Sequence, residues 1–507
     1  MQGRREKPRR ILLAAGIAAL VLLLGFAAVR LVRLERRSGG PETTERLQQA
    51  AMGLDEIAIE AQLYPDSRSM TVRQTLQLTS RTAEGRDTLV LRTWPNAFQK
   101  PDTSPVAGDA GLCPDGFSAG SLVMEEAAVE LNGQQVRLEH RYADAAKTVL
   151  ELPLPEIWQP GESLTVTLCY TVNFPHIQYR FGWWGDTFAA GHAFAVPALW
   201  QNGAYRTDAW LPVGDPLSGE CMNWTLTLQV PKTHQVAATG RITGTSQNTD
   251  GTDLYIIDAP AVREMGLVIS PEIRKVSRRA GGVQVEAWAA DPAQARRLLD
   301  TAAKAVESFS GLYGDYPYPV YTVCALPMGV SGAEYPGLSL IDADLLAGSA
   351  ETLEYAVVHE TAHQWWYSLV GSDSSTHPWL DEALCEYSLL SYVEARHGRA
   401  AREELRQSRV ESSMRVTVAG QATPGAPLDY FETGTDYMVL VYGRAASMLC
   451  AVDELLGGRL DETLRAYADR YAFQMADRSD FLRLVQENTG VDIEPLMVDY
   501  LDTYLIN

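Results

Sequence analysis

The stretch VVHETAHQWWYSLV, from Val357 to Val370, places two histidines four residues apart with a glutamate beside the first. The flanking sequences LEYAVV and QWWYSL fit a helix, and residues four apart lie one above the other on a helix face. His359 and His363 are therefore expected to reach one Zn²⁺, while Glu360 borders the ion as a general base for water. The alternative is a pair of solvated histidines on an amphipathic helix.

A third ligand distinguishes these interpretations, because zinc in a catalytic site needs three protein ligands and one open position. In WLDEALCEY, Glu382 follows His363 after 18 intervening residues. This length allows the first helix to end near Gly371 and a second helix to return. Glu382 is therefore the predicted third ligand of a single zinc ion. Glu386 lies one turn further on the same face, where it either orients a histidine ligand or remains a solvated charge.

The chain has 507 residues, too many for one ordinary core, and a formal net charge of −21. Nine Arg or Lys and two Glu fall within residues 1–37, so the remainder carries about −28. So acidic a body argues against nucleic acid as a partner, and it tolerates cationic ligands better than anionic ones.

An uncharged apolar run, ILLAAGIAALVLLLGFAAV, extends from Ile11 to Val29 and is long enough to span a bilayer as a helix. Basic residues flank it on both sides, within residues 1–10 and after Val29. We therefore predict a transmembrane anchor, followed by a polar stalk over residues 30–53. A cleavable signal peptide is the competing interpretation. The expected location is the cell membrane, with a single pass and the domains that follow the anchor outside the cytoplasm.

The remaining sequence divides into two halves of different character. Residues 54–276 contain short runs with alternating apolar and polar residues, such as NWTLTLQV, separated by turns rich in Gly, Pro, Asp and Asn. This pattern predicts an antiparallel all-β domain. The basic turn SRRAGG (277–282) is a plausible boundary. Residues 277–507 mix a few strands with helices that dominate after Glu351, which indicates an α+β domain.

HETAHQWW together with WLDEALCEY resembles the gluzincin aminopeptidases, the group of aminopeptidase N and leukotriene A-hydrolase. SGAEYPGLSLI resembles that family's Gly-Ala-Met-Glu-Asn motif, with Glu334 in the glutamate position and Tyr335 replacing the asparagine. The resemblance implies that Glu334 grips the substrate's α-ammonium group. It also implies that Gly332 and Ala333 bind the peptide backbone.

VYGRAASMLC resembles the family's helix start with the catalytic tyrosine, which places Tyr442 where a phenol donates a hydrogen bond to the oxyanion. Tyr437 is the rival candidate. The resemblance further implies a β-saddle domain ahead of a thermolysin-like catalytic domain, in a short, membrane-anchored member without the family's C-terminal helical domain.

The predicted function is a zinc metallopeptidase that releases amino-terminal residues from peptides by attack of a zinc-bound water. Two alternatives remain. One is a zinc endopeptidase with an open cleft, and the other is an inactive peptidase fold that serves as a surface binding protein.

Overall fold

Alternating apolar and polar residues give the first half of the chain strands with one buried face. The computed structural model describes residues 44–215 and 218–503. In β2 (Ser69–Thr79), Met70, Val72, Leu76 and Leu78 are buried, while the side chains between Met70 and Val72 and between Leu76 and Leu78 are exposed. Such a strand suits a sheet that packs one face on a core.

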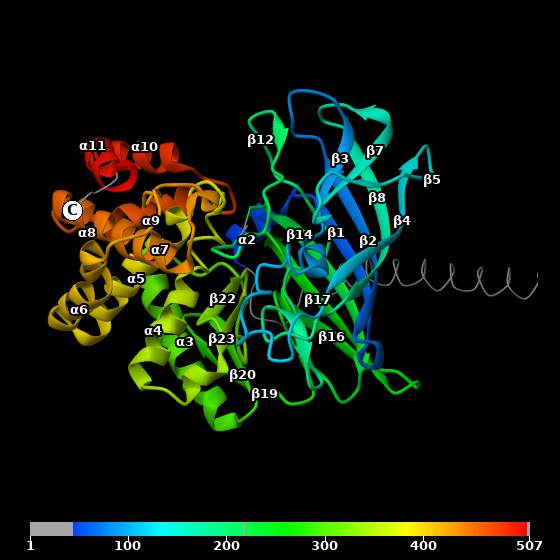
Figure 1. The fold of residues 1–507 in the computed structure, drawn as a ribbon, viewed down its shortest axis with the longest axis horizontal. Helices are drawn as coiled ribbons and strands as arrows, with labels where there is room; N and C mark the ends of the chain where they lie inside the picture. Colours follow the sequence, from blue (N-terminus) through cyan, green and yellow to red (C-terminus); the bar gives the residue numbers. More distant parts are fainter. Residues whose placement is uncertain (1–43, 216–217, 504–507) are drawn as a thin grey trace, which may run out of the picture. The chain divides into compact units, whose positions relative to one another are not determined.

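β2 lies inside an eight-stranded sheet (Figure 1). Its strands, in spatial order, are β16 (Arg241–Gln247), β17 (Thr252–Val262), β14 (Met222–Pro231), β1 (Glu56–Tyr64), β2, β8 (Ser163–Asn173), β4 (Ser121–Leu131) and β5 (Gln134–Arg137). The predicted all-antiparallel pairing is wrong at one place, because β1 and β14 run parallel. These two strands are far apart in the sequence, so no hairpin turn sets their relative direction.

Three smaller sheets complete the β half. One has the order β15 (Gln235–Ala238), β18 (Leu267–Ser270), β10 (Thr187–Ala190) and β9 (Phe181–Trp184). Another has the order β11 (Val196–Pro197), β3 (Arg86–Arg92), β7 (Val149–Trp158) and β6 (Arg141–Tyr142). The pair β12 (Trp200–Gln201) and β13 (Ala204–Tyr205) forms the third.

A five-stranded mixed sheet opens the second half of the chain. Its order is β19 (Arg274–Ala280), β20 (Val283–Ala289), β21 (Val320–Leu326), β23 (Leu338–Asp342) and β22 (Gly332–Tyr335). The turn SRRAGG, predicted to separate the domains, lies instead within the β19–β20 hairpin of this sheet. Gly281 and Gly282 both have positive φ there, and glycines in a hairpin turn look the same in sequence as glycines in a linker.

Helices cover one face of this sheet and continue to the end of the described chain. α3 (Pro292–Tyr313) packs on β19 and β20, and α4 (Ala350–Ala362) packs on β22 and β23 (Figure 1). The later helices are α5 (Trp379–His397), α6 (Arg399–Leu405), α7 (Gly434–Tyr437), α8 (Ala445–Leu455), α9 (Leu460–Arg470), α10 (Arg478–Thr489) and α11 (Glu494–Met497). A β-rich half is thus followed by an α+β half in which helices dominate, as predicted.

The last residues of the predicted stalk differ from the prediction, because Glu45–Ala51 form helix α2. The Thr44 hydroxyl accepts a hydrogen bond from the Leu47 amide, and the Leu47 side chain is fully buried. Arg46 donates to the carbonyls of Ala468 and Asp469 at 3.0 and 2.8 Å. A seven-residue helix held by one apolar side chain is too short for its periodicity to be read in the sequence.

The predicted anchor over residues 11–29 lies outside the described residues. Among residues 44–215 and 218–503, no helix combines the length and apolar character needed to span a bilayer.

Candidate metal centre and active site

The two histidines of the H-E-x-x-H motif lie at the end of α4. The helix stops at Ala362, earlier than the predicted end near Gly371, and His363 is its C-cap. Tyr367 has a φ of 116°, and Trp366 and Val370 form an isolated bridge, so QWWYSL folds into tight turns. A non-glycine residue with such a φ cannot continue a right-handed helix. The turns expose neither tryptophan, since Trp365 and Trp366 are buried.

Three donor atoms converge beside this helix end. The Nε2 atoms of His359 and His363 are 3.2 Å apart, and Glu382 Oε2 lies 3.3 Å from the first and 3.6 Å from the second. Ligands about 2.1 Å from a tetrahedral zinc ion lie roughly 3.4 Å from one another, so the triangle has the size that zinc requires. Glu382 comes from the first turn of α5, the returning helix that the spacing predicted.

The other ring nitrogen of each histidine faces a carboxylate. His359 Nδ1 lies 2.9 Å from Glu386 Oε1, and His363 Nδ1 lies 2.7 Å from Asp381 Oδ1. Asp381 accepts a hydrogen bond from His363 Nδ1, and Glu386 forms an ion-pair contact with His359 Nδ1. A proton held on each Nδ1 atom leaves lone pairs on both Nε2 atoms. Two lone pairs that face each other across 3.2 Å, beside the Glu382 carboxylate, form a donor set for a cation. The arrangement therefore fits a zinc ion.

Glu386 is in turn held by a guanidinium group. Arg409 Nε and Nη2 lie 2.6 and 2.8 Å from the two carboxylate oxygens of Glu386. Burial opposes a charged carboxylate, but Arg409 and His359 outweigh it and lower the pKa of Glu386 to about 2. Of the two alternatives for Glu386, the structure shows a fully buried, hydrogen-bonded group and not a solvated charge.

The carboxylates make this point of the protein favourable for positive charge. Burial alone disfavours a charged imidazole, yet hydrogen bonds to Glu382 and Glu386 raise the pKa of His359 to about 9. Burial likewise opposes the ionised Glu382 carboxylate, but the two histidines lower its pKa well below the usual range. A bound cation with two positive charges would replace these protons as the positive charge that balances the carboxylates.

Glu360 lies against the edge strand β22. A Cβ atom added at Gly332 would meet Glu360 Oε1 at 2.3 Å, so the carboxylate occupies the space that glycine leaves. Glu360 is buried, its Oε2 has no hydrogen-bond partner, and burial raises its pKa. A carboxylate with a raised pKa beside a metal site is suited to accept and return a proton.

Glu334 also points toward the metal centre. One oxygen or nitrogen atom from each of Glu334, Glu360 and His363 lies within 4.8 Å of the other two. Glu334 is buried with an unpartnered Oε1, and burial raises its pKa well above the usual range. Its strand β22 is the terminal strand of the five-stranded sheet, so one backbone edge of Gly332 and Ala333 is not paired with another strand.

Tyr442 stacks on the first histidine, with 5.6 Å between the ring centres of His359 and Tyr442. It lies in a π-helical turn, Met438–Arg444, and such turns occur often at functional sites. Burial and the nearby Glu382 carboxylate raise the pKa of the Tyr442 phenol well above its usual value, so the phenol keeps its proton. Tyr437 is 5.7 Å from Tyr442, centre to centre, and does not stack on a histidine.

Polar residues of the β half lie close to Glu334 and were not predicted. The buried Arg180 forms an ion pair of 2.9 Å with Asp215, and both groups influence the pKa of Glu334. His192 Nδ1 lies 2.6 Å from Glu264 Oε2. These residues are widely separated in the sequence and form no spacing motif, so no local signal identifies them.

Tyr335, which stands where the related family has asparagine, fills a gap in the β half. A Cβ atom added at Gly191 would meet the Tyr335 hydroxyl at 1.9 Å, and one at Gly266 would meet its ring at 2.8 Å. Its ring centre is 5.4 Å from that of His192. The Tyr335 side chain thus packs into the β half and holds the neighbouring Glu334 in place.

Comparison with known proteins agrees with this arrangement. Residues 297–500 match the family described as Peptidase family M1 domain. The chain is 25% identical to aminopeptidase M1-B of Oryza sativa subsp. japonica over 220 residues, which is 41% of this chain and 25% of that protein. It is 28% identical to aminopeptidase N of Lactobacillus delbrueckii subsp. lactis over 222 residues, 40% of this chain and 26% of that protein. The match therefore spans about a quarter of the length of these relatives.

Among solved structures, an M1 zinc metallopeptidase from Deinococcus radiodurans has the same fold. The TM-score is 0.61 at 18% identity, and the alignment covers 90% of this chain and 94% of that one. A mutant of that protein was solved with a bound Tyr-Ser-Ala substrate, and it aligns with a TM-score of 0.60 at 20% identity over 90% of this chain and 95% of that one. The resemblance to the gluzincin aminopeptidases is confirmed, and it rests on residues 297–500, which match the peptidase family M1 domain.

Proposed function

We propose that this protein is a zinc aminopeptidase. The observation that carries the proposal is the triangle of His359, His363 and Glu382 donors with two further buried carboxylates, Glu360 and Glu334, beside it. One carboxylate suits proton transfer, and the other suits a cationic amino terminus. Peptidases of this kind need both functions within one residue length of the metal.

His359, His363 and Glu382 would hold the zinc ion, which supplies Lewis-acid activation of water and of the peptide carbonyl when bound. Glu360 takes a proton from the attacking water as its oxygen bonds to the carbonyl carbon. The Tyr442 hydroxyl donates a hydrogen bond to the oxygen that becomes negative. When the carbon–nitrogen bond breaks, Glu360 passes the proton to the leaving amine.

Glu334 accepts hydrogen bonds from the substrate's α-ammonium group, which neutralises the buried carboxylate. The open backbone edge of Gly332 and Ala333 pairs with the extended substrate as an added strand. These two contacts place the first peptide bond, and no later one, next to Glu360. The chemical class of substrate is therefore a peptide with a free amino terminus.

Hydrolysis of aminoacyl arylamides by the purified full chain tests the proposal. We expect activity that a chelator abolishes and added zinc restores. Glu360→Gln should retain zinc and lose activity by about 100-fold or more, the usual contribution of a general base. A Glu360→Gln protein with full activity would refute the mechanism.

An endopeptidase with the same metal site is the second candidate, because the donors His359, His363 and Glu382 with Glu360 beside them would serve either activity. A pentapeptide with a free amino terminus and the same peptide with an acetylated one separate the two activities. An aminopeptidase cleaves only the free form, because the acetyl group removes the charge that Glu334 binds. Equal cleavage of both peptides would show that Glu334 does not select a free amino terminus. A purified protein that contains no zinc and has no activity would instead favour a binding protein.

We further propose that residues 11–29 anchor the chain in the cell membrane with the catalytic region outside the cytoplasm. The uncharged run between basic flanks supports this proposal. Protease added to intact cells should remove a tag at the carboxyl end of the chain. A tag that is protected until the cells are lysed would contradict the orientation.

A further inference from the structure

A second cavity lies apart from the metal centre, where the β half meets the five-stranded sheet. On one side of this contact, the face of the sheet opposite α3 packs tightly, with Trp288, Cys324 and Leu340 against Ala237 and Val268. Beside that packed region the two halves separate, and a cavity of about 470 Å³ opens. None of the residues that line it belongs to the metal centre.

The cavity exists because two strands diverge from one glycine. β15 and β16 are joined through Gly240, whose φ of +85° favours glycine. β15 continues in the four-stranded sheet and β16 in the eight-stranded one. The small side chains of Ala237 and Ala238 leave the space between the strands open.

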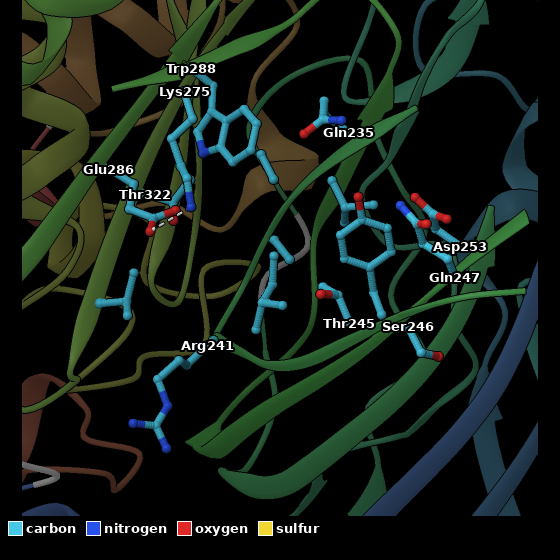
Figure 2. A pocket seen from close by; sticks show the side chains of 17 residues that line it. Gln235, Arg241, Thr245, Ser246, Gln247, Asp253, Lys275, Glu286, Trp288 and Thr322 are labelled. Atoms are coloured by element: carbon cyan, nitrogen blue, oxygen red, sulfur yellow. Dashed lines mark hydrogen bonds and ion pairs between the residues drawn. The ribbon is translucent and has the colours of Figure 1, made fainter. Parts of the chain in front are cut away.

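Two buried polar groups without partners belong to residues on opposite walls of this space. Trp288 is 3% exposed, and its indole Nε1 has no hydrogen-bond partner. Asp253 Oδ1 is also buried and unpartnered. Figure 2 shows Trp288 on one wall, beside Lys275, Glu286 and Thr322, and Asp253 on the other wall, beside Gln247. A buried donor and a buried acceptor without partners each carry a cost that a suitable ligand removes.

The charges of the cavity do not favour a simple anion or cation. Lys275 Nζ forms an ion pair of 3.1 Å with Glu286 and lies 5.3 Å from the centre of the Trp288 ring. Within the described chain, the lining groups without a hydrogen-bond or ion-pair partner include the Trp288 N–H, the Asp253 carboxylate, the Gln247 amide and the Arg241 guanidinium. Donors and acceptors and both signs of charge are therefore present. A ligand that carries donors and acceptors together, without net charge, matches them.

The strands that border the cavity add backbone groups to this set. β15 is the terminal strand of its four-stranded sheet, and β16 is the terminal strand of the eight-stranded sheet. Each pairs on one side only, so each presents amides and carbonyls at the spacing of an extended chain. β15 has four residues, which corresponds to about 13 Å of extended peptide.

We propose that this cavity is a second peptide-binding site, which takes a short extended segment with its main chain against β15 and β16. A main-chain carbonyl of the peptide accepts from Trp288 Nε1, and a main-chain amide donates to Asp253. The volume of the cavity lies in the range of sites for small ligands. Because binding at this site needs neither a free amino terminus nor zinc, it can be tested separately from the proposed activity.

The test uses the full chain with Glu360→Gln and the blocked peptide acetyl-Val-Thr-Val-amide, which has no amino terminus for Glu334 to bind. Binding measured by ligand-observed NMR should give a dissociation constant of about 1 mM or lower. Trp288→Phe keeps an aromatic ring but removes the donor, so we expect binding about five-fold weaker.

Thr245→Trp places a large side chain in the cavity from the exposed residue Thr245 and should abolish binding. The matched control is Thr249→Trp, at an exposed position of the next turn that does not line the cavity. Both variants should keep the arylamide hydrolysis of the unsubstituted chain when Glu360 is present. Unchanged binding to Thr245→Trp, or no binding at about 10 mM peptide, would overturn the proposal.

Discussion

Glu386 and Arg409 show how single side chains outside the ligand set prepare the metal centre. Arg409 binds both oxygens of Glu386, and Glu386 in turn faces His359 Nδ1. We expect Glu386→Gln to lower zinc affinity by about 10–100-fold, because the His359 ring loses its charged hydrogen-bond acceptor. Competition with a chromophoric chelator measures this affinity. Glu394→Gln, on the exposed face of the same helix, is the control, and equal zinc affinities for the two variants would contradict the prediction.

Gly332 matters because of the space that it leaves. Gly332→Ala would place a methyl group 2.3 Å from Glu360 Oε1, so the carboxylate that we propose as general base must move. We expect kcat to fall by about 100-fold or more while zinc stays bound. Circular dichroism and metal analysis should match those of the original protein. A variant with normal kcat would show that Glu360 does not need its observed position.

Individual site residues could be predicted from the sequence where a single helix or motif brings them together. His359, Glu360 and His363 follow from helical spacing, and Glu382 follows from the length of a returning helix. Arg409 could not be predicted as the partner of Glu386, because 23 residues and a helix break separate them. Arg180 and Asp215 meet only through the packing of the β half, which no local pattern encodes.

Helix α3 illustrates stability at the scale of one element, because one glycine lies inside the helix and another, in a different conformation, caps its end. Gly311 lies inside the helix and is exposed, and a Cβ atom added there would meet no neighbouring atom within 4 Å. We expect Gly311→Ala to raise the free energy of unfolding by about 0.5–1 kcal/mol, since alanine loses less entropy in a helix. Gly314, the C-cap, has a φ of +102°, which alanine adopts only with strain. Gly314→Ala should therefore lower the free energy of unfolding by about 1 kcal/mol or more. Urea unfolding of both variants measures the difference, and changes of the same sign would contradict it.

Elements were predictable where one period runs through a whole segment, and less so at their ends. The alternating strands of the β half and the amphipathic α3 follow from such periods. The early end of α4 depends on the backbone of Tyr367, and the parallel pairing of β1 with β14 depends on a connection of more than 150 residues. Both are set by tertiary packing and not by local preference.

At the scale of the whole described chain, one buried guanidinium group connects the β half to the catalytic half. Arg263, directly after β17, donates to the carbonyls of Gly219, Tyr367 and Gln474 at 2.7, 2.8 and 2.7 Å. Gly371 makes room for it, because a Cβ atom there would meet Arg263 Cζ at 2.2 Å. The buried carbonyl of Tyr367 and the partly buried carbonyls of Gly219 and Gln474 thus share one cation, so the two halves should unfold together.

We expect Arg263→Met to lower the free energy of unfolding by about 3 kcal/mol or more, because it keeps most of the side-chain volume but removes the cation that three carbonyls share and leaves the buried Tyr367 carbonyl without its donor. Gly371→Ala should have a similar effect by displacing the same guanidinium group. Arg278→Met, which removes an exposed ion pair with Asp300, is the control and should change stability by less than about 1 kcal/mol. Urea unfolding followed by tryptophan fluorescence measures all three, and equal midpoints for Arg263→Met and Arg278→Met would show that the halves do not depend on this contact.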